Sequence, residues 1–356
     1  MQHWLARDAA GEPLSDRHCA PNEQPSQTPA STEALIAQLR VSLARDSDLG
    51  FIGAQAIAGA LRERLPAGAV PSVRTIARIL ARLGLLDAGK RVRRAPPPVG
   101  WHLPAVAARA ADVDAFDCIE DLPIEGVGLA HILTAKSVLG PLTGAWAAPK
   151  ITAAFVIECL TRHWRKHGLP SFAHFDNDTR FQGPHNRPNV IGAVILFCLR
   201  LGITPVFAPP RETGFQAGIE GFNALWQAKV WRRFHHLGFA ALQERLDSFC
   251  AACTALRAAR SEHAIVRRPW PRQGPAKTIA KGTLVFIRRT SETGSVRILE
   301  RTYEVDDQWA HRLVRCELDV ITRTLRFFRL RRRTPSRQPL AKKRQLIGHL
   351  KLQNPK

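Results

Sequence analysis

The first regular apolar pattern in the chain lies between residues 32 and 84, where leucine and isoleucine recur three or four positions apart. This spacing predicts three short helices, which begin near Thr32, near Ile52 and after Ser72. Ser72 is a good N-cap for the third helix, and Gly84 is a good C-terminal stop. Residues 1–30 have no apolar period and are rich in Pro, Ser, Gln and Asp, which predicts a mobile tail.

From Trp101 the pattern changes to strands and helices in succession. Runs with apolar residues at alternate positions predict strands, and runs with the helical spacing predict helices. The strands are expected over residues 113–118, 129–138, 142–146, 171–175 and 203–207, and the helices over 151–167, 190–201 and from Gln216 onward. This order of a strand meander, helix, strand, helix, strand and helix predicts an α/β domain over residues 101–268.

The stretches on either side of this α/β region complete a multidomain organisation. Residues 31–89 form the helical domain, and residues 90–100 form a linker in which four basic residues precede three prolines, an extended and semi-rigid composition. After Pro271, alternating segments over 283–289, 296–305, 310–318 and 325–330 predict four strands of a small β-barrel, residues 269–335. Residues 336–356 are then expected to be a basic tail.

Charge narrows the choice of partner. Lysine and arginine number 52 against 30 acidic residues in a chain of 356, a formal net charge of +22, which favours a polyanion such as nucleic acid over a small acidic metabolite. The alternative is a basic but otherwise ordinary protein. No window reaches the roughly 18 uninterrupted apolar residues of a membrane helix, so no membrane partner is expected. We expect a cytoplasmic, nucleoid-associated location.

The basic residues gather where they could contact DNA. In the third predicted helix, Arg74, Arg78 and Arg82 lie off the apolar stripe, as in a helix-turn-helix whose last helix enters the major groove. The alternative is a small helical bundle with a solvated arginine face. Near the other end, Arg331, Arg332 and Arg333 belong to a stretch of 36 residues with twelve lysines or arginines and no acid. A phosphate backbone is a natural partner for that stretch.

Acidic residues stand out against this cationic background. Asp176 follows an apolar strand in the run His-Phe-Asp-Asn-Asp, and Glu220 lies near the start of the predicted helix, so the two carboxylates could share a metal ion. A cluster of six acids within residues 112–125 adds candidates, although a solvated acidic loop would also explain it. Asp114 and Asp117 lie on opposite faces of an extended strand.

The order of these elements, with Asp-Asn at Asp176 and Glu-x-x-Asn from Glu220 to Asn223, resembles the integrase catalytic core of retroviral integrases and insertion-sequence transposases of the DDE type. The resemblance covers roughly residues 101–250 and implies a ribonuclease H-like fold, a mixed sheet with flanking helices. It assigns the second acid to Asp176 and the third to Glu220. The first acid falls on Asp117, with Asp114 as the second choice. The chain departs from the family pattern at Asp178, where the family usually has glycine.

The resemblance implies a bacterial integrase-like transposase that cleaves and joins DNA ends by in-line phosphoryl transfer with two Mg²⁺ or Mn²⁺ ions. Asp117 would bridge both ions, while Asp176 and Glu220 would bind one each. Asn223, Gln227 and Lys229 are candidates to contact double-stranded DNA beside the site. Two ends must be joined together, which implies a homo-oligomer, at least a dimer. The alternative is a catalytically inactive DNA-binding protein or regulator that retains the fold.

Overall fold

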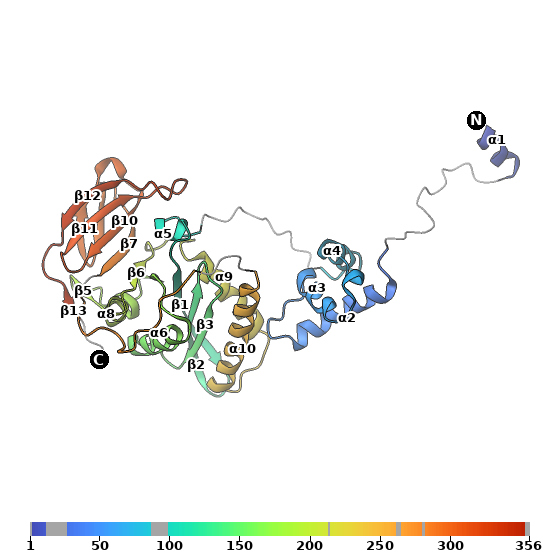
Figure 1. Cartoon of the computed structure of the whole chain (residues 1–356), viewed down its shortest axis with the longest axis horizontal. Helices are drawn as coiled ribbons and strands as arrows, with labels where there is room; N and C mark the ends of the chain where they lie inside the picture. Colours follow the sequence, from blue (N-terminus) through green and yellow to red (C-terminus); the bar gives the residue numbers. More distant parts are fainter. Residues whose placement is uncertain are drawn as a thin grey trace. The chain divides into compact units, whose positions relative to one another are not determined.

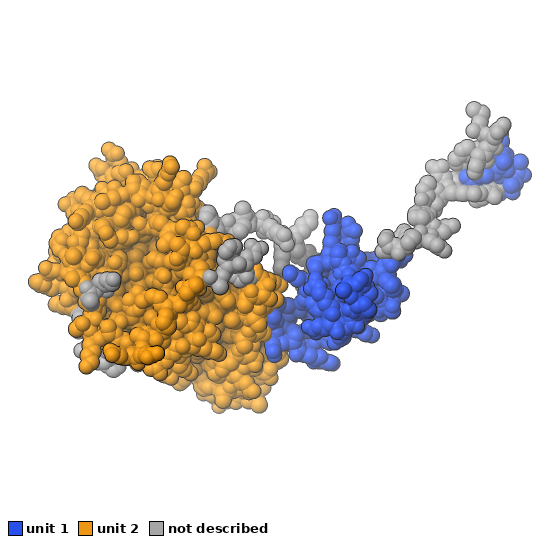
Figure 2. Space-filling model, in the orientation of Figure 1, with its two compact units in different colours: residues 1–91 blue, residues 92–356 orange. Residues whose placement is uncertain are grey.

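The chain forms two compact units, residues 1–91 and residues 92–356 (Figure 2). The computed structural model describes residues 2–11, 27–86, 99–212, 214–260, 265–279 and 282–352. Most of the predicted linker lies outside these residues, as do residues 12–26 of the predicted tail. The sequence pattern missed a helix at the start of that tail, α1 (Gln2–Ala9). No helix in the described ranges is long and apolar enough to cross a membrane.

Unit 1 contains the three helices that the apolar spacing predicts. They are α2 (Ala30–Asp46), α3 (Ala54–Arg62) and α4 (Val73–Arg82), with a short 3₁₀ turn, η1 (Ala67–Ala69), before the last. Isoleucines and leucines from all three helices form one buried cluster. The predicted N-cap is confirmed, because the Ser72 hydroxyl accepts a hydrogen bond from the backbone N–H of Thr75 at 3.1 Å.

The three arginines of α4 point away from this cluster. Arg74, Arg78 and Arg82 are all exposed, as their positions off the apolar stripe predict. Arg82 also forms an ion pair with Glu33 of α2. Helix α4 therefore carries two exposed arginines, Arg74 and Arg78, and a third, Arg82, that joins α4 to α2.

Unit 2 is built on one mixed sheet (Figure 1). Its central strands are β1 (Val113–Ile124), β2 (Gly128–Ser137), β3 (Thr143–Ala148), β4 (Phe172–Phe175) and β6 (Thr204–Phe207). Strands β1, β2 and β3 pair antiparallel as a meander, whereas β4 pairs parallel with β1 on one side and with β6 on the other. The resulting order in this part of the sheet is β3-β2-β1-β4-β6.

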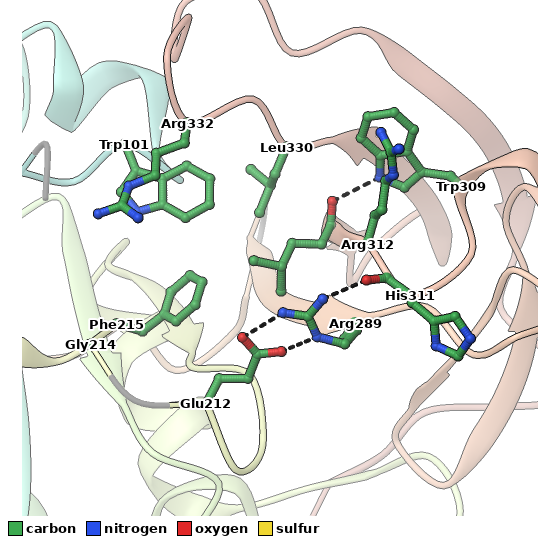
Figure 3. Close-up of a pocket in the computed structure, with 11 residues that line it drawn as sticks. Trp101, Glu212, Gly214, Phe215, Arg289, Trp309, His311, Arg312, Leu330 and Arg332 are labelled. Atoms are coloured by element: carbon green, nitrogen blue, oxygen red, sulfur yellow. Dashed lines mark hydrogen bonds and ion pairs between the residues drawn. The ribbon is translucent and has the colours of Figure 1, made fainter.

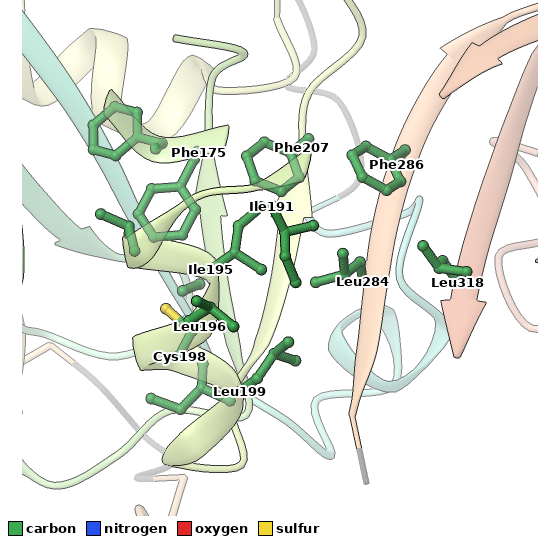
Figure 4. Close-up of a cluster of buried hydrophobic side chains, with 14 of the residues drawn as sticks. Phe175, Ile191, Ile195, Leu196, Cys198, Leu199, Phe207, Leu284, Phe286 and Leu318 are labelled. Carbon is green, nitrogen blue, oxygen red and sulfur yellow. The ribbon is translucent and has the colours of Figure 1, made fainter. Parts of the chain in front are cut away.

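Helices cover both faces of these strands. On one face, α6 (Ala153–His167) and α8 (Ala193–Arg200) pack over the core, where α8 directs its side chains toward Phe175, Phe207 and Phe286 (Figure 4). The other face carries α9 (Ala217–Trp226) and α10 (Phe239–Ala258), which contact β1, β2 and β3. Short elements complete the layer around the sheet: α5 (Pro104–Ala107), α7 (Thr179–Gln182) and the paired strands β5 (Val190–Ile191) and β13 (Lys351–Leu352).

The long helix expected from Gln216 is interrupted. After α9 a π-helical turn, η2 (Gln227–Trp231), follows directly, and α10 begins only after Gly238, whose φ is +159°. The interruption lets the chain reverse, so that α10 packs beside α9, with the rings of Phe222 and Phe249 stacked at 6.2 Å. A helical apolar pattern alone does not reveal such a break.

The predicted separate β-barrel is not confirmed, because its strands extend the core sheet. Strand β7 (Thr283–Arg289) pairs parallel with the free edge of β6. Strands β10 (Leu313–Asp319), β11 (Thr324–Arg329) and β12 (Leu340–Gln345) then continue the sheet in antiparallel fashion to nine strands. The physical reason is the open edge of β6, whose unpaired backbone groups are satisfied by an apolar strand that is buried on both faces.

Two further expectations for the C-terminal part need correction. The predicted strand over 296–305 is a separate hairpin, β8 (Ser295–Ile298) and β9 (Arg301–Glu304), with a turn in which Leu299 and Glu300 have positive φ. The predicted basic tail contains β12 and β13, so its described part is folded onto unit 2.

Candidate active site

Asp117 and Asp176 are brought to the same end of the sheet by two parallel strands. The register pairs Ala115 of β1 with His174 of β4. Two residues further along each strand, on the same face, come Asp117 and Asp176. Both side chains are half-buried at this end. The alternation that places Val113, Ala115 and Asp117 on one face thus brings Asp117 beside the end of β4.

Glu220 is supplied by the helix on the same face. It lies in the first turn of α9, which packs against β1 and β2, and it is exposed. The ammonium group of Lys136, on β2, donates to the carbonyl of Gly218 at 2.7 Å and so joins the start of α9 to the sheet. One turn after Glu220, the Asn223 amide donates to Asp117 Oδ2 at 2.7 Å. Because of the Glu-x-x-Asn spacing, the same side of α9 presents the carboxylate of Glu220 and, through Asn223, holds the carboxylate of Asp117.

The charges of these three acids interact. The pKa of Asp117 is raised to about 6, mainly by burial and in smaller part by repulsion from Asp176 and Glu220. Hydrogen bonds from the Cys118 backbone N–H, at 2.9 Å, and from Asn223 act in the opposite direction. Burial also raises the pKa of Asp176, whose Oδ1 accepts from the backbone N–H of Asp178 at 3.0 Å. The charges of Asp176 and Glu220 therefore disfavour the ionisation of Asp117.

The chemistry of this donor set fits a hard divalent cation. Carboxylate oxygens are the ligands that Mg²⁺ and Mn²⁺ prefer, and a cation would relieve the repulsion that raises the pKa of Asp117. In the described residues, however, no three or more His, Cys, Asp or Glu side chains are grouped closely enough to hold an ion together. Asp117 Oδ2 is also occupied by the Asn223 amide. Binding would therefore require the side chains to turn toward the ion.

Asp114, the second choice for the first acid, lies in the buried core and forms hydrogen bonds there. It is fully buried and accepts from the Trp164 indole at 2.9 Å and from Arg267 Nη1 at 3.1 Å. Arg267 also lies 3.6 Å from Asp112, so one guanidinium neutralises two buried acids. These contacts direct Asp114 to the face opposite Asp117 and Asp176.

An ion-pair network beside Asp176 was not anticipated. Arg180 donates through Nε to Asp178 Oδ1 at 2.7 Å and through Nη1 to Glu120 Oε1 at 2.6 Å. Asp178 is also the N-cap of α7, where it accepts from the Arg180 backbone N–H at 2.7 Å. Asp178, where the integrase pattern usually has glycine, thus caps a helix and fixes an arginine near the carboxylates. An aspartate followed two residues later by arginine at a helix start was the available signal.

The other predicted DNA-contacting residues are dispersed. Asn223 is only 6% exposed and is directed toward Asp117, so the structure gives it a partner within the protein. Gln227 and Lys229 are half-buried in η2. Arg331, Arg332 and Arg333 are exposed just after β11, while the arginines of α4 belong to unit 1.

The large mixed sheet with helices on both faces fits a ribonuclease H-like core. Among solved structures, the chain is similar to the catalytic core domain of BIV integrase, with 20% sequence identity over 38% of this chain and 81% of that one, and a TM-score of 0.27. It is also similar to a chain of the simian T-cell lymphotropic virus intasome in complex with PP2A regulatory subunit B56 gamma, with 14% identity over 68% and 83% of the two chains and a TM-score of 0.32. No protein-family model and no curated protein sequence matches the chain.

Replacing Asn223 by leucine is expected to raise the pKa of Asp117 above its value of about 6. The substitution removes a hydrogen bond to the ionised carboxylate, which is worth about 1.5–3 kcal/mol or roughly one to two pKa units. The pKa can be measured by NMR titration of carboxyl-labelled aspartate in metal-free protein. Gln227→Leu, one turn further along, is the matched control. An unchanged Asp117 titration in Asn223→Leu would contradict the assigned contact.

Proposed function

We propose that the protein is a metal-dependent polynucleotidyl transferase that cleaves DNA and joins DNA ends, as a transposase or an integrase-like recombinase. The observation that carries the proposal is geometric: Asn223, one turn after Glu220 on α9, donates to Asp117 Oδ2 at 2.7 Å, and Asp176 follows the strand that pairs parallel with β1. Three acids at this position of such a sheet suit phosphodiester chemistry, because the attacking and leaving oxygens both need stabilisation by metal-held charge.

Each acid has a distinct part in this proposal. Bound Mg²⁺ or Mn²⁺ would supply the charge that activates the attacking oxygen and stabilises the leaving oxygen. Asp117, central to the electrostatic group, would be the ligand shared between two ions. Asp176 and Glu220 would bind one ion each. Asn223 orients the Asp117 carboxylate, and the contact of Lys136 with Gly218 holds the start of α9 in place.

DNA binding is proposed for the basic surfaces that the sequence singles out. The exposed arginines of α4, Arg74 and Arg78 in particular, suit a recognition helix in the major groove. Arg331, Arg332 and Arg333 suit a phosphate backbone, in keeping with the net charge of +22. The partner would be double-stranded DNA, both element ends and target. Joining two ends requires at least a dimer.

A catalytically inactive DNA-binding regulator is the second candidate. It is favoured by one observation, that no group of three potential metal ligands is assembled among the described residues. A strand-transfer assay separates the two functions, because a regulator would bind DNA but would form no joined product.

The test is a strand-transfer assay with labelled duplex ends whose sequences are taken from the DNA on either side of the gene. Joined product is expected with Mg²⁺ or Mn²⁺ and is expected to disappear when EDTA removes the metal. Ca²⁺, which has the same charge but looser coordination geometry, provides the matched metal control. Equal product with and without EDTA would refute the metal-dependent transferase. DNA binding without product in every metal would favour the regulator.

A further inference from the structure

A cavity of about 330 Å³ lies in unit 2 next to the candidate active site. It is lined by Ala115 of β1, His174 of β4 and the first residues of α9. Ala115 and His174 are the residues two positions before Asp117 and Asp176 on the same sheet face. The cavity, called the inner pocket below, therefore adjoins the carboxylates along the strands.

The inner pocket contains polar atoms that have no hydrogen-bond partner among the described residues. His102 and His174 are 6% and 2% exposed, and His102 Nδ1 and His174 Nε2 are buried without a hydrogen bond. The side-chain nitrogen of Gln216, at the start of α9, is also buried without a hydrogen bond. Buried polar groups are almost always hydrogen-bonded, and three such atoms around one cavity point to a ligand that completes them.

The remaining lining of the inner pocket selects a planar and neutral ligand. The Trp101 and Phe215 rings lie 5.6 Å apart, and the Phe215 ring lies 5.6 Å from that of His102, so flat faces border the cavity. Burial lowers the pKa of His102 to about 3, which leaves its imidazole neutral at physiological pH. Lys136 is the charged residue in the lining, and it already donates to the Gly218 carbonyl. A heteroaromatic ring with hydrogen-bonding edges matches these features.

A second cavity adjoins the first. This outer pocket has a volume of about 500 Å³ and shares Trp101, Gly214 and Phe215 with the inner pocket (Figure 3). Arginines also line this outer pocket. Arg312 lies over the Trp309 ring at 4.7 Å, Arg332 is exposed, and Arg289 is held by the Glu212 carboxylate, with one contact at 2.8 Å. Aromatic rings alternating with guanidinium groups are typical of surfaces that hold unpaired nucleic acid strands.

We propose that the inner pocket binds a nucleobase turned out of the DNA stack beside the reacting phosphodiester, while the arginines of the outer pocket hold the phosphates of the same strand. Enzymes that turn out a base commonly read it by hydrogen bonds to its edge and by stacking on apolar or aromatic walls, the two features combined here. The inner pocket volume lies in the range of roughly 300–1,000 Å³ that holds small ligands. The inference rests on the proposed function, because the base belongs to the DNA on which the transferase acts.

The hydrogen-bonding edge and the stacking wall can be tested separately from catalysis. The full chain would be irradiated in EDTA with a short duplex that ends in one unpaired iodouracil nucleotide, and the crosslinked peptides would be mapped by mass spectrometry. Crosslinks are expected at Trp101 or Phe215. They are expected to fall about fivefold in His102→Leu, since a lost hydrogen bond of average strength weakens binding by that factor.

The variants are chosen so that folding does not obscure the result. Replacing a buried polar group that lacks a protein partner by an apolar one is neutral or stabilising, so His102→Leu is expected to keep the wild-type melting temperature. Gln216→Leu removes another of the unpartnered atoms and provides a second variant. The matched control is His236→Leu, because His236 is equally buried, also has an unpartnered nitrogen, and lies outside both pockets.

Crosslinks that map elsewhere, or that are equally strong in wild type, His102→Leu and Gln216→Leu, would overturn the base pocket. This result is distinguishable from failure of the proposed function. A protein that crosslinks at Trp101 or Phe215 in EDTA but never joins DNA with Mg²⁺ has the pocket without the transferase activity. One that joins DNA without the crosslink is a transferase without the pocket.

Discussion

Replacing Asp117 by asparagine is expected to reduce the rate of DNA strand transfer by about a thousandfold or more. An amide carries no charge and binds hard cations far more weakly than a carboxylate, so the ligand proposed to be shared by both ions is lost. Loss of about 4 kcal/mol of transition-state stabilisation corresponds to this factor. Asp176→Ala is expected to behave alike. Equal product from wild type and either variant in the Mg²⁺ assay would exclude the proposed triad.

Asp117→Asn is also expected to stabilise the metal-free protein above about pH 6. The folded-state pKa of Asp117 is raised from 3.8 to about 6, so between these values the folded state binds more protons than the unfolded state. The free energy of unfolding therefore falls as pH rises through this window, and the full cost of the buried charge is present above it. Asparagine has no such cost.

The difference in unfolding free energy between Asp117→Asn and wild type is thus expected to grow from pH 4 to pH 6 and then level off at about 1–3 kcal/mol. Urea unfolding in EDTA at several pH values measures it. Glu125→Gln, at an exposed position beyond the strand end, is the control and should change neither stability nor transfer. A stability difference that is constant with pH would mean that the Asp117 carboxyl titrates normally in the folded protein.

Replacing Asp114 by asparagine is expected to destabilise the protein by about 3–5 kcal/mol while leaving the chemistry of the folded fraction intact. Asp114 is 0% exposed, and the change leaves the Arg267 guanidinium, whose side chain is 10% exposed, without its closest partner. The Trp164 indole also loses the charged acceptor of its hydrogen bond. Unfolding in urea measures the loss, and single-turnover transfer on folded protein measures the chemistry.

A double substitution separates the cost of leaving Arg267 unpaired from the other effects of Asp114→Asn on stability. Arg267→Met removes the unpaired charge, so Asp114→Asn combined with Arg267→Met should regain part of the stability that Asp114→Asn loses. If Asp114→Asn instead kept full stability and abolished transfer, Asp114 and not Asp117 would be the first acid.

The central fold could be predicted because its elements are local. Alternation and helical spacing within single segments anticipated β1 to β4, α6, α8 and β6, and the motifs at Asp176 and Glu220 marked the ends of two of the predicted elements. Alternation also placed Asp114 and Asp117 on opposite faces. It could not tell which face would meet α9, because that depends on where helices far along the chain pack.

The features that escaped prediction involve residues distant in sequence. The parallel pairing of β6 with β7 joins segments nearly eighty residues apart, Phe207 to Phe286, and no periodicity reports it. The inner pocket likewise gathers His102, His174 and Gln216 from three separate segments. No spacing in the sequence relates these three residues, and only their common cavity makes the unpartnered atoms informative.

The continuous nine-strand sheet has a mechanical consequence. A DNA-binding module on a flexible tether can rotate, so the distance between its contacts and the active site varies. In this protein a hydrogen-bonded ladder runs from β1 through β4, β6 and β7 to β11, the strand that precedes Arg331, Arg332 and Arg333. Under the proposed function, the sheet would hold the basic residues at a constant distance from the active site. The span between the arginines and Asp117 would fix how many nucleotides separate the anchored phosphates from the bond that is cut.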